Sequence, residues 1–389
     1  MKLLILYTKN RQEIFNKKSA LGSYINYLGN LLENNGFEVF LNGERLTEIK
    51  YQTHQVNNSH SKLSFIKKII PKKLKRYIRE KKHLKDLDVF YDELKNKPQK
   101  YDAILEYYNL GSNIGLKLSK SQNIPYYIFY DGPILDEYQF FNHAKPFFFK
   151  EVIKREKESF KHAKKIVAQS NPMKDYIVNH ICECSDKIVI HQNVDYTKFD
   201  ILEGEKVFNT DVLNIGFIGS FLPWHQVDLL VNAFAFIIKK GVKANLYLIG
   251  DGMERKSVEN YCNTLPNEIK DKITFTGFVT EKELYQLKSK IDIGVMSGSN
   301  WYGAPLKIFE YGAMKMACIA PDTPTIKDLF PNNEVVFFEW KNQVSLNDKL
   351  LNLCQDIEKI KYNSKILNQK VLNKYSSQNT INFYKTLIN

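Results

Sequence analysis

The sequence has 389 residues, 43% apolar and 25% charged, with too few Gly and Pro (18 and 12) for a disordered chain, and its length suits two domains. No stretch approaches the roughly 18–20 continuous apolar residues of a membrane helix, and the apolar run at residues 3–7 is shorter than the roughly 7–15 of a signal peptide. Residues 62–85 carry +10 of the formal net charge of +13, so the rest of the chain is nearly neutral.

The first half of the sequence alternates short apolar runs with segments whose apolar residues recur every three or four positions. This is the pattern of strands that alternate with helices, and it predicts a parallel sheet covered on both faces. The expected strands are 3–7, 37–41, 103–106, 126–129 and 166–168, and the expected helices are 24–32, 114–118, 149–162 and 173–178. The basic segment is an insertion, residues 62–86, between the second and third of these strands.

The basic insertion has eleven Lys or Arg and one acid, Glu80, within residues 62–85. Apolar residues recur there at helical spacing, and Pro71 should divide the segment into two helices. The segment has no zinc or helix-turn-helix pattern, which favours an anionic membrane surface over nucleic acid. The alternative is a solvated helix whose apolar stripe packs on its own domain. The residues expected to contact the membrane are Lys67, Lys68, Lys72, Lys73, Lys75 and Arg76.

The cysteines are odd in number and scattered, which argues against a disulfide framework and favours a reducing cytoplasm. They are Cys182, Cys184, Cys262, Cys318 and Cys354. Cys182 and Cys184 have no second ligand pair at zinc-site spacing, so we expect ordinary local structure there and no metal.

The second half of the sequence follows a linker at residues 194–207 and repeats the alternation more regularly. The expected strands are 213–218, 244–249, 273–276, 291–296 and 317–320; the helices are 229–238, 254–265 and 281–290, one from Pro305, and a final one at 380–388. We predict an α/β chain with a Rossmann-like domain at 1–200, a second at 201–375 and a C-terminal helix at 376–389.

Four blocks of the second half occur in the order of a known family. They are residues 216–225, 248–252, 275–279 and 304–311, and residues 164–170 and 192–195 with Phe199 add support. In these blocks the chain resembles the family-4 retaining glycosyltransferases. The resemblance implies the GT-B fold, in which two Rossmann-like domains face each other across a cleft and the last helix returns to the N-terminal domain.

The last block also has a physical meaning of its own. Pro305 suits the first turn of a helix, and the N–H groups at a helix start attract an anion such as a diphosphate. Lys307 would add a positive charge, and Glu310, one turn later, would accept hydrogen bonds from both ribose hydroxyls. In an isolated motif, Lys307 would be solvated and Glu310 would pair locally.

The resemblance assigns the nucleotide sugar to a set of residues at these blocks. They are Gly219, Ser220, Gly250, Phe278, Val279, Tyr302, Ala304, Pro305, Leu306 and Glu310. Three positions depart from the family: Tyr302 stands where many members have an acid, and Ser220 and His225 stand where many have Arg and Lys. We expect His225 and Lys307 to act on the leaving diphosphate. The alternative for His225 is a helix-start residue without ligand contact.

Two residues of the first half are candidates for the acceptor side. Gly22 precedes the first helix, where the family has a glycine-containing loop that lines the acceptor. Asp131 follows the strand 126–129, and the C-terminal ends of strands carry functional groups in open α/β sheets, so we expect Asp131 to face the reacting sugar. The alternative is that residues 131–133 only form a turn.

The resemblance implies a retaining transfer of a sugar from a nucleotide sugar to a glycan or lipid-linked acceptor, in bacterial-type envelope polysaccharide or glycoconjugate synthesis. Such chemistry needs charge neutralisation and positioning more than acid or base side chains. We expect no metal and no cofactor, and a cytoplasmic protein bound peripherally to the inner face of the cell membrane. The alternatives are an inactive homologue that serves as a scaffold or partner subunit, and a basic nucleic-acid-binding protein.

Overall fold

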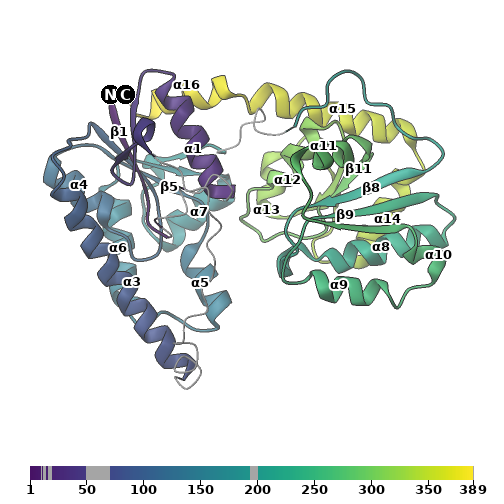
Figure 1. Cartoon of the computed structure of the whole chain (residues 1–389), viewed down its shortest axis with the longest axis horizontal. Helices are drawn as coiled ribbons and strands as arrows, with labels where there is room; N and C mark the ends of the chain where they lie inside the picture. Colours follow the sequence, from purple (N-terminus) through teal and green to yellow (C-terminus); the bar gives the residue numbers. More distant parts are fainter. Residues whose placement is uncertain (10, 12–14, 16–19, 50–70, 193–199, 389) are drawn as a thin grey trace. The chain divides into compact units, whose positions relative to one another are not determined.

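The computed structural model describes residues 1–9, 11, 15, 20–49, 71–192 and 200–388. The chain forms two compact units: the first is Met1–His191 with Phe383–Asn389, and the second is Gln192–Asn382 (Figure 1). Each unit is a largely parallel sheet with helices on its faces. Among the described residues, none of the helices is long and apolar enough to span a membrane.

The sheet of the first unit has seven strands within the described residues, in the order β3-β2-β1-β4-β5-β6-β7. Only the short β3 runs antiparallel to its neighbour. The central strands β4 and β5 are fully buried on both faces and consist of apolar and aromatic residues except for one buried acid, Glu106 in β4. The strands are β1 (Lys2–Tyr7), β2 (Glu38–Leu41), β3 (Glu44–Arg45), β4 (Ala103–Tyr107), β5 (Tyr126–Tyr130), β6 (Lys165–Ala168) and β7 (Ile188–Ile190).

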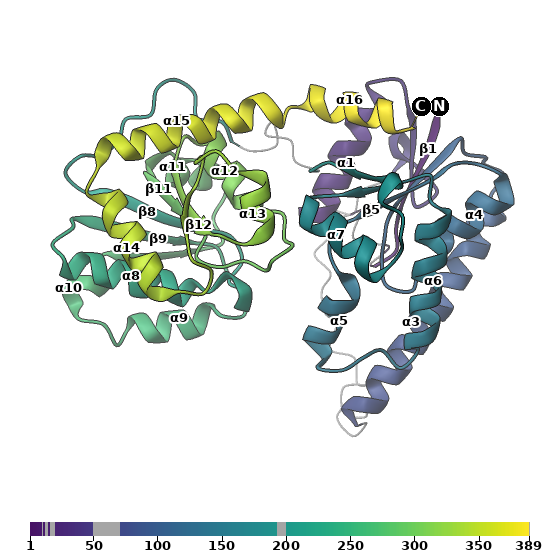
Figure 2. The same ribbon diagram turned by 180° about the vertical axis from the view of Figure 1, so that it is seen from behind.

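The helices of the first unit lie on both faces of this sheet. They are α1 (Ala20–Glu33), α3 (Lys72–Lys95), α4 (Ile114–Gln122), α5 (Ile134–Asn142), α6 (Phe149–His162) and α7 (Asn171–His180). Helices α3, α4 and α6 lie side by side, and α1 packs against β2 (Figures 1 and 2). Helix α1 begins four residues earlier than the sequence predicts, so Gly22 lies inside its first turn and not before it.

The sheet of the second unit has six strands among the described residues, in the order β10-β9-β8-β11-β12-β13, all parallel. The strands are β8 (Leu213–Ile218), β9 (Ala244–Ile249), β10 (Ile273–Gly277), β11 (Ile293–Val295), β12 (Ala317–Pro321) and β13 (Val336–Phe338). The helices are α8 (Val227–Lys239), α9 (Arg255–Cys262), α10 (Asn267–Lys270), α11 (Glu281–Lys290), α12 (Leu306–Ala313), α13 (Pro324–Leu329), α14 (Gln343–Cys354) and α15 (Ile357–Lys374).

Two apolar layers hold the second unit together, one on each face of its sheet. Helices α8 and α14 pack together over one face, where Phe234 is fully buried. Helices α12 and α15 pack together over the other, where Phe309 is fully buried. The second layer fixes α12, whose first turn carries the candidate site (Figure 2).

The last helix, α16 (Ser377–Ile388), ends in the first unit. The Tyr127 hydroxyl donates a hydrogen bond to the Ile388 carbonyl oxygen at 3.2 Å. The ring of His191 stacks on that of Phe383 with the centroids 3.8 Å apart. These contacts attach the C-terminal end of the chain to the first sheet.

Acid should weaken the docking of α16. Burial lowers the pKa of His191 to about 4, against about 6.5 in an unfolded chain. The unfolded state therefore binds more protons below pH 6.5, and stability falls as the pH drops from about 6.5 to 4, by at most about 3 kcal/mol for this group. Thermal unfolding at pH 7.5 and pH 5 should show a smaller pH dependence in His191→Phe than in the wild type. The exposed His180, changed to Phe, should leave that dependence unchanged; an equal effect of both changes would contradict the assignment.

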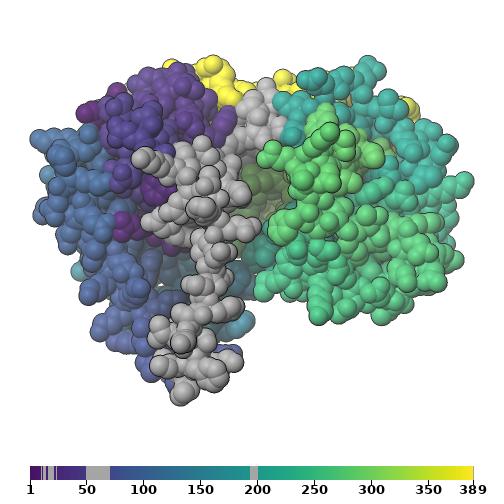
Figure 3. All heavy atoms as spheres, viewed as in Figure 1, coloured from purple at the N-terminus to yellow at the C-terminus, as the bar shows by residue number. Residues whose placement is uncertain are grey.

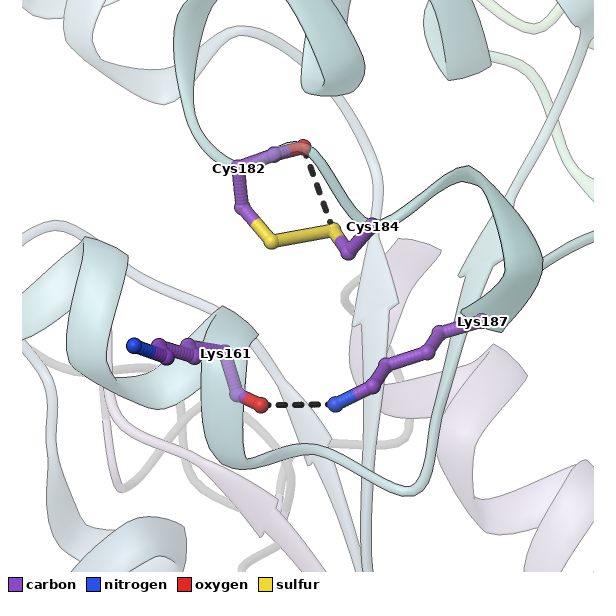
Figure 4. The surroundings of a disulfide bond; sticks show 4 residues. All are labelled: Lys161, Cys182, Cys184 and Lys187. Atoms are coloured by element: carbon purple, nitrogen blue, oxygen red, sulfur yellow. Dashed lines mark hydrogen bonds between the residues drawn. A yellow bond between two sulfur atoms is a disulfide. The ribbon is translucent and has the colours of Figure 1, made fainter.

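A disulfide joins Cys182 and Cys184 just after α7 (Figure 4). The sequence analysis expected no disulfide framework, and this bond joins residues only two positions apart, so it connects no distant elements. The other cysteines, Cys262, Cys318 and Cys354, are thiols. In the same turn, the Lys187 ammonium donates to the Lys161 carbonyl oxygen at 2.7 Å and ties the turn to the end of α6 (Figure 4).

Candidate active site

The candidate residues of the second unit lie where open α/β sheets bind ligands. The chain leaves β8 for β9 on one side and later returns to β11 on the other, so the strand order reverses between β8 and β11. Gly219 and Ser220 directly follow β8, and Gly250 directly follows β9. Residues 302–305 lie in the connection from β11 to α12. The strand ends and the start of α12 therefore form one site.

Two glycines allow the backbones of this site to approach each other. Gly219 and Gly250 have φ values of +137° and +124°, a backbone conformation that residues with a side chain rarely adopt. A Cβ on Gly250 would lie 2.2 Å from the Gly219 carbonyl oxygen, and a Cβ on Gly219 would lie 2.6 Å from the Cε of Lys307. The glycine pair therefore makes room for the Lys307 side chain beside the strand ends.

Tyr311 joins helix α12 to the strands β8 and β11. Its hydroxyl accepts a hydrogen bond from the Ile218 N–H at 3.4 Å and donates one to the Val295 carbonyl oxygen at 3.3 Å. The ring lies against Gly294, where a Cβ would come within 2.5 Å of it. This contact was not predicted from the sequence. The available signal was a glycine inside a strand, which often marks the close approach of another group.

The start of α12 differs slightly from the expectation. Pro305 is the residue before the first helical turn, and the helix begins at Leu306. Lys307 is then the second residue of the helix, and Leu306 is half exposed. The N–H groups of Leu306 and Ile308 donate to the Ala304 and Pro305 carbonyl oxygens at 2.9 and 2.8 Å, and the aligned peptide dipoles place partial positive charge at this helix start.

Lys307 and His225 form the central contact of the site. His225 belongs to the short helix η5 (Pro223–His225) after β8 and is buried. The Lys307 ammonium lies 2.9 Å from His225 Nε2, and His225 Nδ1 contacts the Ser220 carbonyl oxygen. Since that oxygen can only accept, Nδ1 carries the proton, and Nε2 accepts from Lys307.

Burial sets the charge states of this pair. It lowers the pKa of His225 to about 4, with a contribution from the neighbouring Lys307 charge. It also lowers the pKa of Lys307 to about 8, while nearby Glu310 acts in the opposite direction. His225 is therefore neutral at pH 7, and its N–H is used within the protein. Nδ1 is therefore engaged with Ser220 and Nε2 with Lys307, and the action of His225 on the leaving diphosphate stays a prediction.

Glu310 forms an ion pair that the sequence did not reveal. Its Oε1 contacts the ammonium of Lys288 on α11, which lies 3.0 Å from Asp200 Oδ2. The Lys288 side chain is only 4% exposed, so this is a buried cation between two carboxylates. Within the described part of the chain, no hydrogen bond involves Glu310 Oε2, so this oxygen is available to a ribose.

The remaining predicted donor residues lie around this centre. Phe278, after β10, is 88% exposed, whereas Val279 packs against the apolar layer beneath α12. The ring of Tyr302 meets that of Trp301 edge to face at 5.3 Å between centroids. Ala304 precedes Pro305, and its carbonyl oxygen accepts from the Leu306 N–H at 2.9 Å.

The candidate residues of the first unit lie at the end of its own sheet. Asp131 follows β5, accepts a hydrogen bond from the Gln169 side chain, and lines a small pocket of about 80 Å³. Gly22 is buried in the first turn of α1, where its carbonyl oxygen accepts from Asn26 Nδ2 at 2.6 Å. Asp131 therefore lines a pocket, whereas Gly22 is engaged within its own helix.

The basic insertion is described only from Pro71 onward, so Lys67 and Lys68 lie outside the described residues. Helix α3 begins at Lys72 after Pro71, and Lys72, Lys73 and Lys75 are exposed. Arg76 differs from them. Its side chain lies 3.4 Å from Glu80 and stands over the Phe147 ring at 4.6 Å, so it is occupied within the unit.

Comparison with known proteins finds a family model that matches part of the chain and solved structures with the same fold. Residues 213–356 match the family described as glycosyl transferases group 1. No curated protein sequence matches the chain significantly.

Solved structures match the whole chain at low sequence identity. A sucrose-phosphate synthase from Thermosynechococcus elongatus has 14% identity and a TM-score of 0.73, with 100% of this chain and 98% of that chain covered. Anabaena HepE, solved with UDP and glucose, has 12% identity and a TM-score of 0.66 at 100% and 99% coverage. The lipopolysaccharide outer core galactosyltransferase WaaB has 16% identity and a TM-score of 0.62 at the same coverage.

The chain therefore has the GT-B fold of glycosyltransferases. The match to the glycosyl transferases group 1 family lies within its second unit.

Proposed function

We propose that this protein is a retaining glycosyltransferase that uses a nucleotide-sugar donor and no metal ion. One observation carries the proposal: Lys307, in the first turn of α12, lies beside Gly219 at the point where the strand order of the second sheet reverses. A helix start, a lysine and a glycine-lined strand end are together suited to a diphosphate. The group 1 match covers the same residues.

The proposed chemistry depends on charge stabilisation at the leaving group. As the bond from the anomeric carbon to the diphosphate breaks, negative charge develops on the phosphate oxygens, and Lys307 and the partial positive charge at the start of α12 stabilise it. The acceptor hydroxyl attacks the anomeric carbon from the face that the diphosphate leaves. A phosphate oxygen takes the proton of this hydroxyl. Approach of a dianion raises the pKa of Lys307 and keeps it protonated.

Other residues have positioning roles in this proposal. His225 orients the Lys307 ammonium through Nε2. Glu310 accepts from the ribose through Oε2, and Lys288 holds the Glu310 carboxylate in place. Asp131 lies at the acceptor end of the first unit. The alternative, an inactive homologue that serves as a scaffold, would retain the fold and bind no donor.

A nucleotide screen tests the proposal. Thermal unfolding is measured with UDP, GDP, ADP and their sugars, beginning with UDP-glucose because HepE was solved with UDP and glucose. A nucleoside diphosphate present at about 100 times its Kd should stabilise the protein by about 2.7 kcal/mol, which is about 5–10 °C for a unit of this size. No shift with any of them would favour the inactive homologue.

We also propose that the start of α3 attaches the enzyme to an anionic membrane, which favours a lipid-linked or envelope acceptor and a cytoplasmic, peripheral location. Lys72, Lys73 and Lys75 are exposed there, and the nearby Leu74 and Ile78 are 48% and 50% exposed. The start of α3 therefore combines exposed cations with exposed apolar residues. Each cation near an anionic surface contributes about 1 kcal/mol.

Vesicle co-sedimentation checks this attachment. The wild type should bind anionic vesicles, fail to bind neutral ones, and dissociate at high salt. Changing Lys72, Lys73 and Lys75 to Gln should reduce binding by about a hundredfold, since about 3 kcal/mol of attraction is lost. A matched variant removes three exposed lysines of α15, Lys359, Lys361 and Lys365. Equal binding by the two variants would contradict a role for α3.

A further inference from the structure

The first unit contains a large pocket that none of the roles above explains. Its volume is about 590 Å³, within the range of small-molecule sites. Side chains of α3, α5 and the start of α6 surround it, together with residues that follow β1 and β4. Helices α3, α5 and α6 all belong to the first unit (Figures 1 and 2). Residues of α3 form part of the molecular surface (Figure 3).

The pocket lies at the ligand-binding edge of the first sheet. The chain leaves β1 for β2 on one side and later reaches β4 on the other side of β1, so the strand order reverses between β1 and β4. Lys9 follows β1, and Asn109 follows β4. Both residues line the large pocket and also the small pocket that contains Asp131, so the two pockets adjoin.

The walls of the large pocket are mainly apolar. Leu84 and Val152 contribute from α3 and α6, Leu110 from the loop after β4, and Phe148 from the residue before α6. Phe141 of α5 also lines the pocket and is 55% exposed, so it lies near the opening. A ligand in this pocket therefore needs a hydrocarbon part.

The charges of the lining favour an anion beside that hydrocarbon part. The one acid of the lining, Glu80, already has partners: Arg76 at 3.4 Å, the Phe147 N–H at 2.6 Å, and the Tyr138 hydroxyl. Arg79 hydrogen-bonds to a neutral group, Asn142 Oδ1, at 2.8 Å, and has no carboxylate partner among the described residues. Lys9 adds a second positive charge where the two pockets adjoin.

We infer that this pocket binds the hydrocarbon chain of an anionic amphiphile. Resting on the proposed function, we assign this amphiphile as the acceptor: a lipid that carries phosphate, with its chain in the pocket, its phosphate near Arg79 and Lys9, and its sugar end toward Asp131. The site then selects lipid-linked over free glycan acceptors.

Calorimetric titration of the full chain with decyl phosphate, below the concentration at which it aggregates, tests the inference. The wild type should bind it, and Leu84→Trp should weaken binding by about tenfold or more, because the indole fills space that the chain needs. Val89→Trp is the matched control: Val89 lies on the same helix, is 44% exposed and does not line the pocket. It should change affinity by less than about twofold. Leu110→Trp repeats the block from the loop if Leu84→Trp fails to fold.

The anionic part is tested with a neutral amphiphile of the same chain length. Arg79→Gln should weaken decyl phosphate by about fivefold and decyl maltoside by less than about twofold, and the exposed Lys82→Gln should affect neither. If the wild type does not bind decyl phosphate, or if Leu84→Trp and Val89→Trp have equal effects, the assignment of the pocket to an amphiphile is wrong. Equal losses for both amphiphiles in Arg79→Gln would overturn the anionic assignment.

The outcomes also separate this inference from the proposed function. Leu84→Trp should bind the nucleotide identified in the thermal screen as the wild type does, since that site lies in the other unit. Nucleotide binding without amphiphile binding removes only the pocket assignment. Amphiphile binding without nucleotide binding would contradict the proposed transferase function but would still support a lipid-binding pocket.

Discussion

Replacing Lys307 by Met is expected to lower kcat for sugar transfer by about 10²–10³, with a smaller change in KM. In the proposed mechanism, Lys307 meets negative charge that develops on the diphosphate only as its bond to the sugar breaks. The ammonium is fixed for this task, because it is held 2.9 Å from His225 Nε2 and packs against Gly219. Steady-state kinetics with the nucleotide sugar from the thermal screen give both constants.

The same substitution should leave the protein folded. Burial lowers the pKa of Lys307 to about 8, which shows that the site disfavours the charged amine, so an apolar side chain of similar length should not lower the melting temperature. Lys327→Met, an exposed lysine of α13, is the control and should retain full activity. If Lys307→Met raises KM and leaves kcat unchanged, Lys307 binds the ground state and has no specific role at the leaving group.

His225 should show the same effect in weaker form. His225→Ala removes the acceptor that orients the ammonium but leaves the Lys307 charge, so kcat should fall less than in Lys307→Met. The double variant should fall no further than Lys307→Met, since both residues act through one ammonium. A further drop in the double variant would mean that His225 touches the substrate itself.

The strand and helix pattern of this chain is largely readable from the sequence. The main strands and helices of the second unit up to β12 follow the expected order, because each of these strands is a short apolar run and each of these helices has a repeating apolar face. Strands β7 and β13 and helices α10, α13, α14 and α15 were not predicted. Strand β3 was not predicted either, although Asn42-Gly43 between β2 and β3 is a strong hairpin signal. Nor was α5, which has no fully buried residue and so lacks the apolar periodicity that identifies a helix.

A candidate site residue can be predicted from the sequence only where its position follows from its neighbours in the chain. Gly219, Gly250 and Lys307 follow strand ends or begin a helix, so their neighbours in sequence indicate their place. The Lys288–Glu310 pair joins α11 to α12, and the Tyr311 contact joins α12 to two strands. Such contacts depend on how elements pack, and a single sequence does not contain that information. The large pocket of the first unit was missed for the same reason.

Replacing Glu310 by Gln is expected to reduce nucleotide affinity by about 10–150-fold, which corresponds to about 1.5–3 kcal/mol for hydrogen bonds to a charged group. The ion pair makes the result of Glu310→Gln alone ambiguous, because loss of the Glu310 charge also leaves buried Lys288 with only Asp200 as a partner. Loss of one partner of a buried pair destabilises a protein strongly. A fall in affinity alone would therefore not separate a ribose contact from a disturbed helix.

A double-mutant cycle with Lys288→Met makes the separation, with nucleotide affinity measured by calorimetry and stability by thermal unfolding. If Glu310 holds the ribose, Lys288→Met should lower the melting temperature yet retain most of the nucleotide affinity, because the Glu310 carboxylate is still present. Adding Glu310→Gln to Lys288→Met should then remove the affinity, while stability is partly regained because one of the carboxylates left without a cation becomes neutral. If instead Lys288→Met alone abolishes nucleotide binding and Glu310→Gln adds nothing, the pair acts only through the packing of α11 on α12, and the ribose must be held by other groups.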